Sequence, residues 1–65
     1  MIVEVNGYKI TANKHTLNAL SILANAAYYH YKEKGYKGLS NEASDIADAI
    51  YNTLDKVGYY DSTRG

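Results

Sequence analysis

The stretch from Thr16 to Lys32, TLNALSILANAAYYHYK, constrains the fold of this chain more than any other part of the sequence. On a helical wheel at about 100° per residue, its apolar residues spread over roughly 240°. A helix lying on a core needs an apolar stripe of only ~100°, so this helix has to be covered on several sides. Asn18, Asn25 and Lys32 interrupt the apolar residues, which argues against a membrane span. We therefore expect this helix at the centre of the fold.

The wheel divides the helix into three sectors. A narrow polar stripe holds Lys14, Asn18, Ser21, Asn25 and Lys32. One flank holds Leu17, Leu20, Leu23, Ala24, Ala27, Tyr28 and Tyr31, and the other holds Ala19, Ile22, Ala26 and Tyr29. One short chain covers only part of so wide an arc, and small residues on the second flank allow another helix to approach closely. The sequence therefore predicts a homodimer with Ala19, Ile22, Ala26 and Tyr29 at its interface. The alternative is that the rest of the chain wraps this helix completely.

Residues 1–12 read as a β-hairpin. Asn6-Gly7 is the strongest short signal for a two-residue hairpin turn, because a type I′ turn needs positive φ at both central positions. This turn pairs Val5 with Tyr8 and opposes Glu4 to Lys9 as a charge pair. One face then carries Met1, Val3, Val5, Tyr8, Ile10 and Ala12, and we expect that face to cover the first helix.

Signals at the helix ends complete the predicted order. Asn13 is the expected N-cap of a helix over residues 14–34, and Gly35 its C-terminal stop. A loop to Gly38 then leads to Ser40, the expected N-cap of an amphipathic helix over residues 41–57. The predicted fold is α+β: a ββαα domain over residues 1–60, with the hairpin packed on an antiparallel two-helix hairpin. Residues 61–65 are expected to form a disordered tail.

Composition narrows the class of protein. The chain has 65 residues and no cysteine, so no disulfide or thiolate zinc site stabilises it. Small domains without such cross-links gain stability by oligomerising, which agrees with the predicted homodimer. The lack of cysteine and of a visible signal peptide fits the cytoplasm, the host cytoplasm if the protein is encoded by a phage. Formal net charge is zero, which gives no overall attraction to nucleic acid or membrane.

The sequence offers no arrangement of residues for catalysis. His15 and His30 lie at opposite ends of one helix, roughly 22 Å apart at 1.5 Å per residue, too far to share a metal ion. Gly35 and Gly38 bracket a turn between helices and do not form a phosphate-binding loop. We predict a protein that is not an enzyme, with no catalytic residue, metal or cofactor.

Tyrosine is the unusual residue, with eight copies and neither Phe nor Trp. Such rings suit half-buried positions and protein interfaces. The predicted partner-binding surface holds Tyr28, Tyr29, Tyr31, Lys34, Tyr36 and Lys37, extended at its widest to Tyr59 and Tyr60. The alternative for Tyr28 and Tyr31 is a place in the core. Interleaved Tyr and Lys also suit stacking on bases and contact with phosphates, so the alternative function is a small dimeric nucleic-acid-binding protein.

A protein-binding module is the favoured class. Small, cysteine-free, tyrosine-rich domains of this kind resemble, in size and style, the proteins that phages and other mobile elements make to bind and block a host factor, including defence factors. No sequence motif carries this resemblance, so it assigns no functional residue. It implies an inhibitor that binds itself and an unidentified protein.

Overall fold

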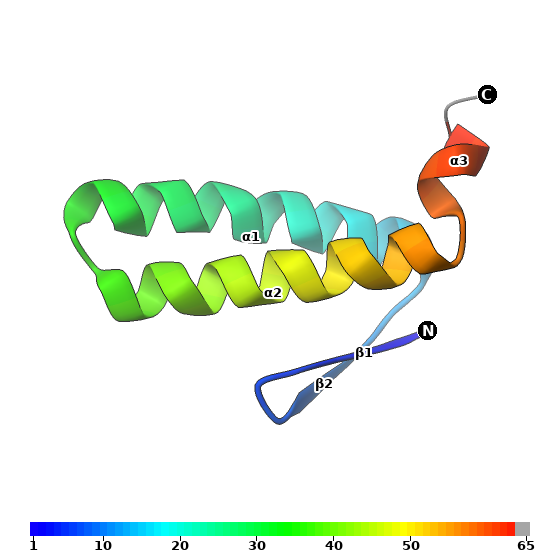
Figure 1. Cartoon of the computed structure of the whole chain (residues 1–65), viewed down its shortest axis with the longest axis horizontal. Coiled ribbons are helices and arrows are strands. Elements are labelled where there is room, and N and C mark those ends of the chain that lie inside the picture. Colours follow the sequence, from blue (N-terminus) through cyan, green and yellow to red (C-terminus); the bar gives the residue numbers. More distant parts are fainter. Residues whose placement is uncertain (64–65) are drawn as a thin grey trace.

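A computed structural model describes residues 1–63 of the chain (Figure 1). Its elements are β1 (Ile2–Val5), β2 (Tyr8–Thr11), α1 (Lys14–Lys34), α2 (Lys37–Lys56) and α3 (Tyr59–Thr63). The two strands form an antiparallel hairpin, and α1 and α2 lie side by side as a long antiparallel pair. The predicted small α+β fold, a hairpin followed by two packed helices, is confirmed. None of the described helices is long and apolar enough to cross a membrane.

The hairpin has the register predicted from its turn. Val5 is paired with Tyr8 and Glu4 with Lys9, and both turn residues have positive φ, +50° at Asn6 and +83° at Gly7. The predicted buried face is only partly correct. Val3 is buried, but Tyr8 is 72% exposed because it stands next to the turn, beyond the edge of the core.

The core lies at one end of the helical pair. Four side chains are almost fully buried there: Val3, Leu17, Ile50 and Leu54. They come from β1, the start of α1 and the end of α2. The hairpin packs mainly against α2, through β1, so the expectation that its apolar face covers the first helix is wrong. Figure 1 shows the hairpin beside the C-terminal half of α2, with the turn between α1 and α2 far from it. The turn end of α1 and α2 therefore extends from the core as a two-helix arm.

The turn between the helices is tighter than predicted. Gly35 ends α1 with φ +83°, and the Tyr36 N–H donates to the Tyr31 carbonyl at 2.9 Å, the pattern of a Schellman cap. The second helix begins at Lys37, four residues before the predicted start. The predicted N-cap at Ser40 is wrong: this residue lies inside the helix, is buried, and donates from its hydroxyl to the Lys37 carbonyl at 3.0 Å.

The C-terminal segment contains a short third helix that was not predicted. Gly58, with φ +75°, ends α2 and starts a reversal into α3. Asp61 lies in this short helix, which runs to residue 63, and the expected disorder of residues 61–65 stays a prediction. Residues 64 and 65 lie outside the described residues. The two tyrosines that begin α3 pack on the core, and this packing explains why the helix forms.

Candidate functional site

The turn end of the arm gathers the tyrosines that the sequence singled out. The ring centroids of Tyr31 and Tyr36 are 6.3 Å apart, and those of Tyr28 and Tyr29 are 5.0 Å apart in an edge-to-face arrangement. Tyr28 and Tyr31 are half-buried, whereas Tyr29 is 60% exposed and Tyr36 is 55% exposed. Two rings are therefore partly covered and two are exposed, and none of the four is among the described residues of the core cluster.

Lysines surround these rings. Lys34 and Lys37 are exposed on either side of the turn, and the ammonium of Lys32 lies 5.5 Å from the centroid of the Tyr28 ring. That distance is within the range of a cation–π contact. We call Tyr28, Tyr29, Tyr31, Lys34, Tyr36 and Lys37 the tyrosine end. It combines flat apolar surface with positive charge.

Tyr59 and Tyr60 do not belong to the tyrosine end. The Tyr59 hydroxyl lies 3.1 Å from Nδ1 of His15, and the Tyr60 hydroxyl donates to Asn18 at 3.2 Å. Both partners, His15 and Asn18, lie in the first turns of α1, at the opposite end of that helix from Gly35. The wider version of the predicted surface is therefore wrong, because α3 folds back beside the start of α1 (Figure 1).

The predicted dimer residues lie together on the exposed side of α1, and Ile22 also borders a groove between α1 and α2. Ala19, Ile22, Ala26 and Tyr29 are all exposed, and the neighbouring Leu23 joins them. The exposed fractions are 61% for Ile22, 65% for Leu23 and 60% for Tyr29. The single chain thus leaves one sector of the wide apolar arc uncovered. We call Ala19, Ile22, Leu23, Ala26 and Tyr29 the outer face.

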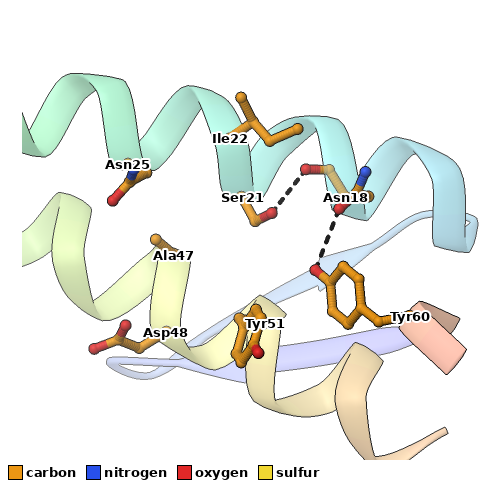
Figure 2. A pocket seen from close by; sticks show the side chains of 8 residues that line it. All are labelled: Asn18, Ser21, Ile22, Asn25, Ala47, Asp48, Tyr51 and Tyr60. Atoms are coloured by element: carbon orange, nitrogen blue, oxygen red, sulfur yellow. Dashed lines mark hydrogen bonds between the residues drawn. The ribbon is translucent and has the colours of Figure 1, made fainter. Parts of the chain in front are cut away.

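A groove of about 440 Å³ runs between α1 and α2 (Figure 2). Its lining residues are Asn18, Ser21, Ile22, Asn25, Ala47, Asp48, Tyr51 and Tyr60. Figure 2 shows Asn25 and Asp48 at one end and Tyr60 at the other. The rings of Tyr51 and Tyr60 stack with centroids 5.1 Å apart. The sequence did not predict this groove, although the polar stripe on the first helix was its signal.

Three residues of the polar stripe, Asn18, Ser21 and Asn25, line the groove. The Ser21 hydroxyl donates to the Asn18 carbonyl at 2.7 Å, and the Asn18 side-chain oxygen accepts from Tyr60. No buried side-chain polar atom of the described residues lacks a hydrogen-bond partner. The groove offers amide, hydroxyl and carboxylate groups to a small polar molecule. Its lining residues include the hydroxyl of Ser21 and the carboxylate of Asp48, and no His, Cys or Lys.

The described part of the chain holds no group of three His, Cys, Asp or Glu side chains that could bind a metal ion. His15 contacts the Tyr59 ring, and His30 contacts the Tyr31 ring at 5.4 Å between centroids. In comparisons with known proteins, no family model, no curated protein sequence and no solved structure matches this chain.

Proposed function

We propose that this protein is a non-enzymatic protein-binding module that holds its partner at the tyrosine end and associates with a second copy through the outer face. The observation that carries the proposal is the exposure of large apolar side chains along α1 and at the turn: Ile22 at 61%, Tyr29 at 60% and Tyr36 at 55%. Contiguous exposed apolar residues on a small protein mark association sites. Tyrosine is the residue type most suited to such a surface, because it gives a large contact at low cost in side-chain entropy.

The tyrosine end is held in place before any partner binds. The Schellman cap at Gly35 fixes the turn, and the Tyr31–Tyr36 contact fixes the ring that follows it. Prior ordering of this kind raises affinity, because less conformational entropy is lost on binding. Lys34 and Lys37 favour a partner surface that is apolar at its centre and acidic at its rim.

Inhibition of a host factor is the biological role we propose for this binding. A compact protein without cysteine remains stable in a reducing cytoplasm, where such a factor would be met. A homodimer that presents two tyrosine ends would block its target by occupying a surface and needs no chemistry of its own. The resemblance to small inhibitors made by phages supports this role.

The test is a capture experiment with two matched double variants. Tyr36→Ala with Lys37→Ala alters the tyrosine end, and Tyr8→Ala with Lys9→Ala alters the same dipeptide on the hairpin, where Tyr8 is 72% exposed. Each purified protein is immobilised, and retained proteins are compared in lysate from the cells that make it. We expect one or more proteins that the native chain and the hairpin variant retain and the tyrosine-end variant loses.

Nuclease treatment of the lysate tests the alternative function. Lys32 over the Tyr28 ring, with two further exposed lysines, is the observation that favours nucleic acid. Retention that disappears with nuclease, together with a steep linear fall of log K with log salt, would replace the protein-binding proposal by this alternative. Equal retention by both double variants, with equal melting temperatures, would remove the tyrosine end as the site.

A further inference from the structure

Four of the five residues of the outer face, all except Leu23, belong to a regular series of positions on α1. Residues 15, 19, 22, 26, 29 and 33 follow one another at spacings of four, three, four, three and four. This is the heptad spacing at which one helix packs along another. The residues in this series are His15, Ala19, Ile22, Ala26, Tyr29 and Glu33, and all six are exposed. The buried residues of α1, Leu17 and Ser21, lie outside this series.

We propose that two copies of the chain pair α1 against α1 in antiparallel, about a twofold axis at the level of Ala24. This inference rests on the self-association proposed above and adds its direction and register. The order of spacings, four, three, four, three and four, is the same from either end of the series. In an antiparallel pair the six positions of one copy therefore align with the six positions of the other. With the axis at this level, position i of one copy faces position 48 − i of the other.

Side-chain size favours this register. Ile22 of each copy faces Ala26 of the other, and Ala19 faces Tyr29. Each large side chain therefore meets a small one, which allows the helices to approach closely and fills the space between them. Because the axis is twofold, each of these contacts occurs twice.

A parallel pair in register lacks this complementarity. Tyr29 would meet the Tyr29 of the other copy, while Ala19 would meet Ala19 and leave a gap. Glu33 would also face a second Glu33, and like charges at this distance repel. Size and charge thus both favour the antiparallel direction.

Charge at the two ends of α1 gives the second argument. The first turn of α1 contains Lys14 and His15 and no acidic residue, so nothing in that turn offsets the positive end of the helix dipole. Glu33 lies in the last turn, where the dipole of its own helix disfavours a carboxylate. Antiparallel pairing brings Glu33 of each copy to His15 and the helix N-terminus of the other. Lys14 and Lys34 lie at the same level but point to opposite flanks, roughly 160° apart on the wheel.

The arrangement has a consequence for the tyrosine ends. Tyr36 lies twelve positions beyond the axis in each copy, so the two tyrosine ends stand at opposite ends of the dimer, roughly 36 Å apart along α1. The dimer then binds two partner molecules separately. A parallel dimer would merge the two ends into one surface.

Single spin labels measure the direction of pairing. The chain contains no cysteine, so His30→Cys and Lys34→Cys each introduce one labelling site, and both positions are exposed. For antiparallel helices 8–10 Å apart, label-bearing Cα atoms are separated by roughly 20 Å at residue 30 and roughly 31 Å at residue 34. A parallel pair places both separations below roughly 15 Å.

Sedimentation equilibrium of the unlabelled chain accompanies this measurement. A dimer whose label separation grows by roughly 11 Å between the two positions supports the proposal. A dimer with equal short separations, or with separations that fit no pairing of α1, overturns the antiparallel register and leaves self-association intact. A monomer at several hundred micromolar overturns the proposed self-association itself. Labelled proteins are compared with the native chain by circular dichroism, so that a loss of dimer through unfolding is recognised.

Discussion

Tyr60 donates a hydrogen bond from its hydroxyl to the side-chain oxygen of Asn18, 3.2 Å away and 42 positions earlier in the chain. This contact joins α3 to the polar stripe of α1 and closes one end of the groove between the long helices (Figure 2). It gives a partly buried amide a partner, so a polar residue is tolerated inside the helix contact.

Replacing Tyr60 by Phe removes this hydroxyl and keeps the ring. We expect the free energy of unfolding to fall by about 0.5–1.5 kcal/mol, the net contribution of one hydrogen bond, because Asn18 loses a partner. Urea denaturation followed by circular dichroism measures the change. Tyr8→Phe is the control, since Tyr8 is 72% exposed, and it should leave the midpoint unchanged. Equal losses in both variants would show that the contact contributes nothing specific.

Local signals explain which parts of the fold the sequence predicted. The Asn6-Gly7 turn set the register of the whole hairpin, because a turn of defined length leaves only one pairing. Asn13 caps α1 as expected, accepting from the Thr16 N–H at 2.8 Å, and Gly35 ends it. Each of these features depends on backbone conformation within a few residues, and such features can be read from a short window of sequence.

The two possible roles of serine, as an N-cap or as a buried residue inside a helix, explain why the start of α2 was mispredicted. A serine hydroxyl that donates to the carbonyl three residues earlier, as at Ser21 and Ser40, is satisfied within its own helix. It can then be buried as a small residue. The same residue type is also a favoured N-cap, and periodicity does not separate the two uses. For this reason the start of α2 and the burial of Ser21 became visible only in the structure.

The order of α3 depended on contacts across the chain. Tyr59 and Tyr60 pack on a core formed by residues from three other elements, and no local pattern indicates that packing. For the tyrosine end, the sequence placed the residues correctly near the turn, because Gly35 fixed where the chain reverses. It did not distinguish the half-buried rings from the exposed ones, which depends on how α1 rotates against α2.

The two glycines near the turn should respond oppositely to alanine. Gly38 lies inside α2 with open space where a Cβ would be added, so Gly38→Ala should stabilise the protein by about 0.5–1 kcal/mol through helix propensity. Gly35 has φ +83°, so Gly35→Ala should destabilise it by about 1 kcal/mol, the cost of a left-handed conformation for an L-residue. Thermal unfolding of both variants measures the difference. A loss of stability in Gly38→Ala would mean that the helix starts after this residue.

Leu54 tests the placement of the core at one end of the helical pair. It is fully buried, and Leu54→Ala should cost about 2–5 kcal/mol, enough to unfold much of a domain this small. Leu39 is 51% exposed on the arm, and Leu39→Ala should change stability by less than about 0.5 kcal/mol. Circular dichroism melting curves compare the two. Similar losses would show that the arm contributes to stability as much as the core does.

Ile22 tests self-association through the outer face. Its side chain is 61% exposed in the single chain, so Ile22→Asp should leave the helical circular dichroism of the monomer intact. In the proposed dimer the same change places an unpaired carboxylate in an apolar contact at two symmetric positions. A loss of about 2 kcal/mol, the threshold of an interface hot spot, raises the dimer Kd by roughly 30-fold.

Leu39→Asp is the matched control for Ile22→Asp. It replaces another exposed aliphatic side chain by the same carboxylate, on α2 and outside the outer face. Sedimentation equilibrium over a concentration series should show the native chain and the Leu39 variant as dimers and the Ile22 variant as a monomer with unchanged helix content. A dimer of native affinity in Ile22→Asp would mean that α1 does not form the interface. If the Ile22 variant is unfolded when dilute, Ile22 must be covered by other parts of the same chain. That result would contradict the exposure of Ile22 in the structure.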